Sequence, residues 1–311
     1  MLALVNTPAG NAPVELREVA EPSPSHDEAV IAVADFSLNR GELTLMRIRP
    51  EGWRPGQDIS GTVVAAASDG TGPKVGARVV ALVDGAGWSE RVAASVHRIS
   101  PLPDKVSFVH AAALPVAGIT ALRTLRYGDP LVGRRVLVTG AAGGVGNLAV
   151  QIAARAGARV TAVVGGPARG RNLASLGAAE IVTGIEKAEG RYALVLESAG
   201  GASLAEALKR VEPKGTVVIF GNSSGETTSI SFRDFITANN ARIQSFHSFT
   251  SGPEEAFAPD LALLVSLVAD GSLVPQVTGE RSWRDFATVA GELRDRRVDG
   301  KAIFRVERAT A

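Results

Sequence analysis

The chain has 311 residues, of which 45% are hydrophobic and 21% charged, and its formal net charge is +1 from 33 basic and 32 acidic residues. This is the composition of a globular protein long enough for two domains, and the balanced charge argues against a nucleic acid or membrane-surface partner. There is no cysteine, which excludes disulfides, a nucleophilic thiol, iron–sulfur clusters and thiolate zinc sites.

The apolar segments and the histidines indicate whether the chain is secreted, crosses a membrane or binds a metal. The N-terminus has no basic segment followed by an apolar core, so we expect no signal peptide. The apolar run 261–269 is under half of the ~20 residues that a membrane-spanning helix needs, so we expect a cytoplasmic protein. We expect no metal, because the four histidines have none of the spacings of a zinc site. They are His26, His97, His110 and His247.

The first 115 or so residues read as short strands separated by glycine and proline turns. Strands at this spacing, without intervening helices, predict a small β-barrel. The predicted strands are 29–38, 61–68, 77–83 and 90–96.

From Arg135 the pattern changes to alternating strands and helices. Such a series predicts a doubly wound parallel sheet. The predicted strands are 135–140, 158–165, 180–182, 192–198, 215–221 and 242–247, and the predicted helices are 145–157, 168–177, 202–210, 232–240 and 254–270. The tail 273–311 ends in AIFRVER, a strand-like segment that we expect to return to the first domain.

The segment VLVTGAAGGVGN (136–147) joins the first strand of this series to its first helix. Glycines at this turn let a dinucleotide pyrophosphate approach the backbone, and the helix N-terminus faces the phosphates with free N–H groups. Ala141 stands at the first glycine position of G-x-G-x-x-G, so the strand and helix on either side carry the prediction. The alternative is a glycine-rich turn that binds nothing. The predicted cofactor contacts here are Ala142, Gly143, Gly144, Val145 and Gly146.

The end of the second strand predicts which dinucleotide is bound. An acidic residue there would hold the ribose hydroxyls of NAD, but this strand ends in Gly165 and Gly166. Arg169 and Arg171 follow, and a guanidinium grips a 2′-phosphate bidentately. We therefore predict NADPH, with Gly165, Arg169 and Arg171 as contacts. A solvated start of a helix is the alternative for the arginines.

Two families compete for the glycine segment. Residues 139–146 also fit TGxxxGxG, the cofactor motif of short-chain dehydrogenases. That family carries a catalytic YxxxK, whereas Tyr127 and Tyr192, the two tyrosines of this chain, are followed four residues later by leucine. We therefore reject that family.

The chain as a whole resembles the medium-chain dehydrogenase/reductase superfamily in its zinc-free, zeta-crystallin-like quinone oxidoreductase branch. The segments that carry the resemblance occur in that branch's order along nearly the whole chain. They are FSLNRGEL (36–43), RPGQDISGTVV (54–64), PLPDKVSFVHAAALPVAGITAL (101–122), GAAGGVG (140–146), VVGGPAR (163–169), FGNSSG (220–225) and DGKAIFRV (299–306).

The resemblance implies a GroES-like β-barrel catalytic domain, formed by 1–115 and 273–311, and a Rossmann NADPH-binding domain at 116–272. It also implies a homodimer, and the segment 242–247 would lie at an exposed edge of the sheet. On the cofactor, it implies contacts by Thr120 near the nicotinamide, as a helix-start threonine, and by the loop after the fifth strand of the second domain. The residues of that loop are Gly221, Asn222 and Ser223.

Two departures from the superfamily pattern bear on the chemistry. Zinc-dependent members carry GHE where this chain has Gly56-Gln57-Asp58, and their cysteine ligands are missing. The usual Asn-x-x-Asp becomes Asn39 followed by Glu42, to which we assign no role.

Without a Lewis acid the acceptor must itself be electrophilic, so we predict hydride transfer from NADPH to a quinone or an α,β-unsaturated carbonyl. Asn39 is the predicted catalytic donor near the developing charge, and its alternative is an Asn bonded within its own loop. We find no general acid, so water is expected to supply the final proton. The segment 44–54 is expected to be a loop over the cleft.

Two other functions stay open at this stage. One is an NADPH-binding protein with little turnover, as some zeta-crystallins are in the lens. The other is a reductase of enoyl thioesters, since related domains occur in polyketide synthases.

Overall fold

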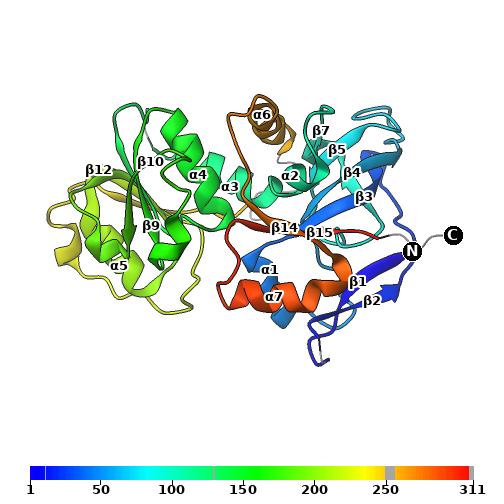
Figure 1. Ribbon diagram of the computed structural model, residues 1–311, viewed down its shortest axis with the longest axis horizontal. Helices are drawn as coiled ribbons and strands as arrows, with labels where there is room; N and C mark the ends of the chain where they lie inside the picture. Colours follow the sequence, from blue (N-terminus) through cyan, green and yellow to red (C-terminus); the bar gives the residue numbers. More distant parts are fainter. Residues whose placement is uncertain (11, 129, 249–255, 308–311) are drawn as a thin grey trace. The chain divides into compact units, whose positions relative to one another are not determined.

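The computed structural model describes residues 1–10, 12–128, 130–248 and 256–307. Residue contacts divide the chain into two compact units. Unit 1 comprises Met1–Ile119 and Ser251–Ala311, and unit 2 comprises Thr120–Thr250. The predicted fold class, an α/β chain with one β-rich part and one doubly wound parallel sheet, is confirmed (Figure 1).

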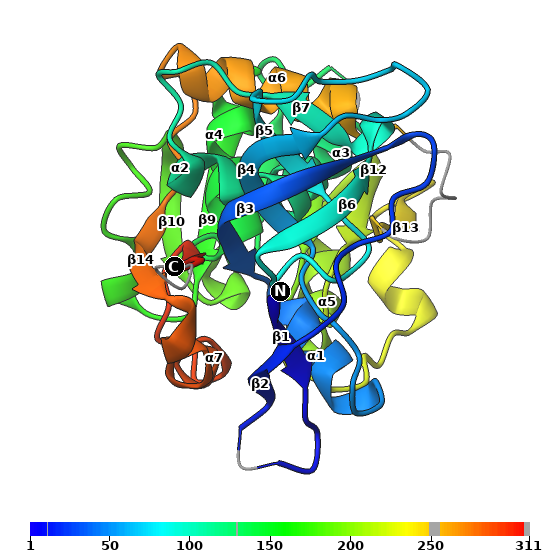
Figure 2. The same ribbon diagram turned by 90° about the vertical axis from the view of Figure 1, so that its right-hand side faces the viewer.

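Unit 1 is organised around β3 (Glu28–Leu38), the longest strand of its sheet. Along one edge β3 pairs with β4 (Asp58–Ala65), and along the other it pairs with β6 (Arg91–Ser95) and then with β15 (Lys301–Arg305). Figure 2 shows β3 between β4 and β6. The predicted return of the C-terminal strand is confirmed, because β15 lies beside β3. The sheet also contains β5 (Arg78–Leu82), β7 (Ile99–Pro101) and β14 (Val277–Ser282).

An aromatic stack fills the core of unit 1. The ring of Phe36 lies 5.7 Å from Trp88 and 5.2 Å from Phe304, and Phe286 lies 4.5 Å from Trp88. All four side chains are buried, so each removes a large apolar surface from water. The Trp88 indole N–H, also buried, donates to the carbonyl of Ser37 at 3.1 Å.

The remaining elements of unit 1 surround this sheet. A hairpin and several helices have no counterpart among the elements predicted from the sequence. They are β1 (Leu2–Asn6), β2 (Val14–Glu18), α1 (Arg40–Ile48), α2 (Phe108–Ala112), α7 (Phe286–Arg294) and the 3₁₀ turns η1 (Val96–Arg98) and η5 (Trp283–Asp285). The predicted loop 44–54 is wrong in its first half, because α1 continues to Ile48.

Helix α6 (Ala258–Ala269) groups with unit 1. The backbone N–H of Phe257, its N-cap, donates to the carbonyl of His97, and the Arg98 guanidinium lies 5.2 Å from the Phe257 ring centre. The predicted helix 254–270 begins at positions 254 and 255, which lie outside the described residues. The predicted limits of the cofactor domain, residues 116 and 272, stay predictions. The first boundary between the two units that the residue contacts define lies within α3 (Pro115–Leu125).

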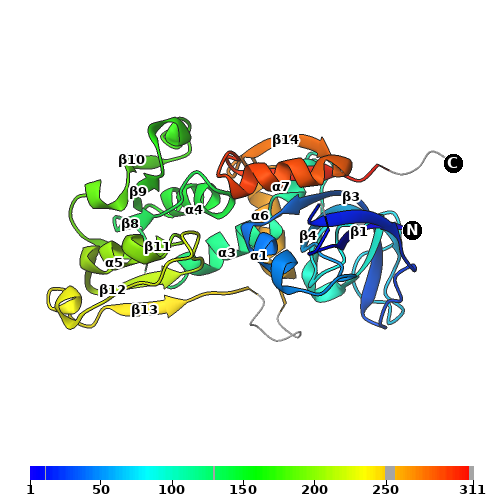
Figure 3. The same ribbon diagram turned by 90° about the horizontal axis from the view of Figure 1, so that it is seen from below.

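Unit 2 is a six-stranded, fully parallel sheet in the order β10-β9-β8-β11-β12-β13. Counted along the chain from β8, this order is 3-2-1-4-5-6, that of the Rossmann fold. Figure 3 shows β10 and β13 at the two ends of this sheet. The strands are β8 (Arg135–Val138), β9 (Arg159–Val164), β10 (Ala178–Thr183), β11 (Tyr192–Glu197), β12 (Val211–Ile219) and β13 (Arg242–Ser245).

Two of the predicted helices in unit 2 are confirmed, namely α4 (Gly144–Arg155) and α5 (Gly201–Arg210). The predicted helix 168–177 is wrong: only η2 (Pro167–Gly170) forms, followed by turns, because Gly170 and Gly177 interrupt the segment. The predicted helix 232–240 is limited to η4 (Phe232–Phe235), and Asn240 has φ +58. A further short turn, η3, spans Ile185–Lys187. In the described residues, no helix has both the length and the apolarity to cross a membrane.

Candidate active site

The glycine loop lies where the strand order of unit 2 reverses. β8 has β9 on one side and β11 on the other, and the loop between β8 and α4 leaves the sheet at the carboxyl end of β8. In open α/β sheets this crevice binds ligands. Residues 142–145 are partly exposed there, and the first N–H groups of α4 have no partner within the helix.

Gly146 is required by close backbone packing. A Cβ atom on it would lie 2.3 Å from the Gly140 carbonyl oxygen and 2.6 Å from the Ala141 Cα. Ala141, at the first glycine position of the motif, is buried and its N–H donates to the Val163 carbonyl. The turn itself is made by Gly140, whose φ is +60. The loop therefore keeps its tight turn despite the alanine and fits a dinucleotide pyrophosphate.

The loop after β9 carries the other predicted cofactor residues. Gly165 follows the last residue of the strand, and a Cβ on Gly165 or Gly166 would meet no atom within 4 Å. Arg169 lies in η2 and is half-buried, and Arg171 just beyond it is exposed. No carboxylate stands at the end of β9, so this edge suits a 2′-phosphate better than ribose hydroxyls.

The loops after β11 and β12 are joined by hydrogen bonds. Ser223 N–H donates to the Ser198 carbonyl at 3.0 Å, and Ser224 N–H donates to the Ala199 carbonyl at 2.8 Å. The Asn222 side chain is used within its own turn, where its oxygen accepts from the Gly225 N–H at 3.2 Å. Gly221 also lies against this junction, since a Cβ on it would be 3.0 Å from the Ser198 oxygen.

A buried carboxylate at the end of β11 organises this junction. Glu197 is fully buried and accepts from the N–H groups of Ala199 and Gly200 at 3.0 and 2.9 Å. Its Oε1 also accepts from the hydroxyls of Ser203 at 2.8 Å and of Thr139 at 3.3 Å. Thr139 directly follows the last residue of β8, so Glu197 connects the two central strands, β8 and β11, at their carboxyl ends. Glu197 was not among the residues predicted from the sequence to take part in the site.

Thr120 lies inside α3, not at its start. It is the sixth residue of Pro115–Leu125 and is buried, and its carbonyl accepts from the Thr124 hydroxyl. The expectation of a helix-start position is therefore wrong, because the helix begins earlier at a proline, a residue favoured in the first turn. The structure gathers the other predicted cofactor residues at the carboxyl ends of β8, β9 and β12.

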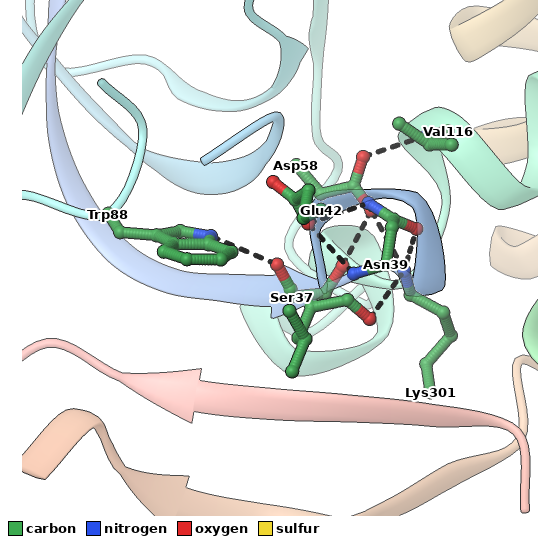
Figure 4. Close-up of polar contacts among 8 residues, drawn as sticks. Ser37, Asn39, Glu42, Asp58, Trp88, Val116 and Lys301 are labelled. Atoms are coloured by element: carbon green, nitrogen blue, oxygen red, sulfur yellow. Dashed lines mark hydrogen bonds and ion pairs between the residues drawn. The ribbon is translucent and has the colours of Figure 1, made fainter. Parts of the chain in front are cut away.

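Asn39 belongs to unit 1, where it is the N-cap of α1 and part of a buried polar cluster (Figure 4). Its amide Nδ2 donates to Asp58 Oδ2 at 2.9 Å and to Glu42 Oε2 at 3.3 Å. Its Oδ1 accepts from Lys301 Nζ at 2.5 Å. The amide is therefore oriented by a cation on its oxygen side and two carboxyl groups on its nitrogen side.

Asp58 is the centre of this cluster. It is fully buried, and its Oδ2 accepts from Ser37 Oγ at 2.6 Å and from Lys301 Nζ at 2.9 Å. Its Oδ1 accepts from the N–H of Val116, in the first turn of α3, at 2.8 Å. Lys301 is itself only 4% exposed. A buried ion pair with this many charge-assisted hydrogen bonds holds the ends of β3, β4, β15 and α3 in one arrangement.

Glu42 completes the cluster and is also fully buried. Its Oε2 accepts from the backbone N–H of Asn39 at 2.8 Å, half of a capping box. Burial raises the pKa of the Glu42 carboxyl to about 8, and the Asp58 charge adds to the rise, while Asn39 and Lys301 oppose it. Glu42 is therefore a neutral acid near pH 7.

Of the cluster, Asn39 was predicted from the sequence to have a role, whereas Ser37, Glu42, Asp58 and Lys301 were not. The available signal was chemical: Asp58 and Lys301 stand at the starts of mainly apolar strands, where a buried charge is expected only if it is paired. Among the described residues, no group of three or more acidic or histidine side chains has the arrangement of a metal site.

Comparison with known proteins gives matches along the chain. Residues 144–266 match a family described as "Zinc-binding dehydrogenase". The chain is 36% identical over 192 residues to the chloroplast envelope quinone oxidoreductase homolog of Arabidopsis thaliana, which covers 56% of this chain and 57% of that protein. It is 28% identical over 265 residues to a quinone oxidoreductase of Pseudomonas aeruginosa, with 80% and 81% covered.

The fold is also that of solved structures. The yhdH oxidoreductase from Salmonella enterica, in complex with NADP, matches 99% of this chain and 100% of its own with a TM-score of 0.81 and 26% identity. Against the chloroplast relatives from Arabidopsis thaliana and Spinacia oleracea, the chain spans only 57% and 55% of their lengths.

These matches, the Rossmann strand order and the glycine loop agree with the predicted resemblance to the medium-chain dehydrogenase/reductase superfamily. The relatives from Arabidopsis thaliana and Pseudomonas aeruginosa are named as quinone oxidoreductases, in line with the zinc-free branch to which the sequence motifs point. The branch fits the chain's own chemistry, because a chain without cysteine has none of the thiolate ligands of the zinc-dependent members.

Proposed function

We propose that the protein is an NADPH-dependent oxidoreductase that delivers a hydride to a quinone or an α,β-unsaturated carbonyl without a metal. The observation that carries this proposal is the glycine loop at the switch point of the sheet, followed by Gly165 and Arg169 where an NAD enzyme has an acid. The relatives named as quinone oxidoreductases and the neighbour in complex with NADP support it.

NADPH, when bound, supplies the hydride. The backbone of residues 142–146 would hold the pyrophosphate, and Arg169 and Arg171 the 2′-phosphate. Thr120 and residues 221–223 are proposed for the nicotinamide side. Together these residues would hold the nicotinamide in one orientation, which lowers the free-energy barrier of hydride transfer.

Asn39 is the proposed donor to the oxygen on which charge develops. Both of its amide hydrogens are directed at carboxyl groups, so an incoming oxygen has to replace one of them. The bond to Glu42 at 3.3 Å is longer than the bond to Asp58 at 2.9 Å, so Glu42 is the partner that yields. No general acid is assigned, and water is the proposed source of the final proton.

The cofactor assignment is tested by fluorescence titration with NADPH and NADH in parallel. We expect wild-type protein to prefer NADPH, and Arg169→Ala to weaken NADPH binding about 10-fold, the loss of a charge-assisted contact, with little effect on NADH. Arg155→Ala, at the opposite end of α4 and exposed, is the matched control and leaves both affinities unchanged. Equal affinity of wild-type protein for the two cofactors would contradict the assignment.

Turnover separates the proposal from its alternatives. Steady-state oxidation of NADPH is measured with small quinones, with enones and with enoyl thioesters. Rates highest on quinones or enones support the proposal. Rates highest on enoyl thioesters favour the thioester reductase, and tight NADPH binding without turnover on any acceptor favours a binding protein.

We also propose a homodimer through the edge strand β13. Its outer edge is unpaired within the described sheet, and the strand and the segment leading into it expose large apolar side chains. Their exposed fractions are 50% for Ile230, 83% for Phe232, 60% for Ile236 and 43% for Ile243. Sedimentation of a dimer that Ile243→Lys converts to a monomer supports the proposal, and a wild-type monomer at micromolar concentration contradicts it. Cytoplasmic localisation stays a prediction.

A further inference from the structure

The polar cluster of unit 1 has more acid than base. Three ionisable side chains are buried together, namely Glu42, Asp58 and Lys301, with exposed fractions of 0%, 0% and 4%. One ammonium group balances one carboxylate, so a second carboxylate here would be an uncompensated buried charge. One of the two carboxyl groups therefore keeps its proton.

The contacts decide which carboxyl is neutral. Asp58 accepts from the Lys301 ammonium, the Ser37 hydroxyl, the Asn39 amide and the Val116 N–H, all within 2.9 Å. Glu42 Oε2 accepts only from Asn39, and Glu42 Oε1 is buried without a partner among the described residues. Asp58 thus has the environment of a carboxylate, and Glu42, with one oxygen buried and unpartnered among the described residues, has that of a neutral carboxylic acid.

The protonation state of Glu42 determines how firmly it holds Asn39. A neutral carboxyl oxygen is a weaker acceptor than a carboxylate, and the Asn39 Nδ2 to Glu42 Oε2 distance is 3.3 Å. An amide hydrogen held so weakly is available to an incoming oxygen. An ionised Glu42 would shorten and strengthen this bond and withdraw the donor.

We propose that Glu42 is a positioning residue that acts in its neutral form, keeping one amide hydrogen of Asn39 available to the substrate oxygen and withdrawing it when Glu42 ionises. This inference rests on the proposed function of Asn39. The charged groups that act on Glu42 are Asp58 on β4 and Lys301 on β15. Helix α7, which also packs against α1, carries Glu292 and the exposed Arg294, and α1 itself carries Arg40 and Arg47.

The first experiment follows the ionisation without any turnover. Infrared titration of the protein without cofactor should show a protonated carboxyl group at neutral pH that disappears above about pH 8 and is missing from Glu42→Gln. In nitrogen-15 spectra, the Asn39 side-chain amide of the wild-type protein should shift with the same midpoint. A carboxylate at Glu42 near pH 7, or an Asn39 amide that does not respond to pH, would overturn the proposal even if no variant folds.

The second experiment is the pH profile of NADPH oxidation with a quinone. Wild-type kcat should fall about 10-fold per pH unit above the Glu42 pKa of about 8. Glu42→Gln, which stays neutral, should keep kcat within about threefold at pH 7 and lose this alkaline limb, whereas a purely structural role would leave the limb in place. Glu51→Gln, an exposed acid, is the control and should retain the limb. A limb that persists in Glu42→Gln contradicts the proposal.

The two experiments fail independently. If the protein turns over no quinone or enone, the proposed function is lost, while the infrared and amide titrations still decide whether Glu42 is neutral and coupled to Asn39. If turnover is observed but neither titration nor alkaline limb involves Glu42, the proposed function stands and this inference falls.

Discussion

The two candidate sites of the molecule are built by opposite means. The glycine loop of unit 2 depends on missing side chains, since a Cβ on Gly146 would lie 2.3 Å from a backbone oxygen. The polar cluster of unit 1 depends on long side chains, which bring an ammonium and two carboxyl groups together in the protein interior. One site is a shape that the backbone offers to a ligand; the other is a balance of charge and hydrogen bonds.

This difference has energetic consequences. A buried polar cluster is stable only when nearly every donor and acceptor is used, so removal of one member leaves the others unsatisfied. The glycine loop has no network of side-chain hydrogen bonds to lose, and only a larger side chain disturbs it. We therefore expect substitutions that remove a charged group to destabilise the cluster, and substitutions that add atoms to disturb the loop.

The largest effect is expected from Lys301→Met, which keeps most of the buried side-chain volume and removes the ammonium. Asp58 then becomes a buried charge without its cation, and breaking such a pair costs about 3–5 kcal/mol of unfolding free energy. Chemical denaturation at neutral pH measures this loss.

The matched control is Lys209→Met, which removes an exposed ammonium paired with Glu206 at 3.3 Å. Exposed pairs contribute about 0–1 kcal/mol, so this variant should be nearly as stable as the wild-type protein. Equal effects of the two substitutions would mean that the cluster is not held by its charge balance, and the contrast between the two sites would be lost.

A smaller effect is expected from Gly146→Ala, the added atom in the loop. The new methyl group meets backbone rather than a flexible side chain, so the loop or the start of α4 has to move, at a cost of about 2–3 kcal/mol. NADPH affinity should fall with it, measured by titration. Gly291→Ala in α7, where the nearest atom is 3.6 Å away, should be neutral or slightly stabilising. A Gly146→Ala protein that binds NADPH normally would show that the loop tolerates a Cβ.

The two sites also differ in how far each could be predicted from the sequence. The glycine loop is contiguous, and its strand and helix are adjacent in the chain, so its motif and location were predictable from residues 136–147. The polar cluster joins residues 19 and 262 positions apart, Asn39 with Asp58 and with Lys301. No local pattern encodes such contacts; they exist only once β3, β4 and β15 have paired.

The errors in secondary structure have a related cause. Helix α1 follows an ordinary strand and was expected to be a loop, yet its start is fixed by Glu42, which bonds back to the Asn39 N–H inside the cluster. In this segment, tertiary contacts outweigh local propensity. The segment 168–177 has helical apolar spacing, but Gly170 and Gly177 interrupt it, and only the 3₁₀ turn η2 forms.

Glu197 sharpens the comparison, because it is a buried carboxylate in unit 2 that is held by dipoles. Its acceptors are satisfied by two N–H groups and two hydroxyls, from Ala199, Gly200, Ser203 and Thr139. Glu197→Gln keeps the shape but places an amide donor against one of these donors, so we expect a loss of about 1–2 kcal/mol, less than for Lys301→Met.

The Glu197 variant should also loosen the neighbouring loop, since Ser223 and Ser224 bond to the carbonyls of Ser198 and Ala199. NADPH affinity should therefore fall about threefold, a small share of the hydrogen-bond energy that is lost. Glu189→Gln, which is exposed in the same unit, serves as the control for both measurements. If Glu197→Gln lost as much unfolding free energy as Lys301→Met, the expected difference between the two sites would be wrong. A buried carboxylate held by N–H and hydroxyl groups would then contribute as much to stability as one paired with an ammonium group.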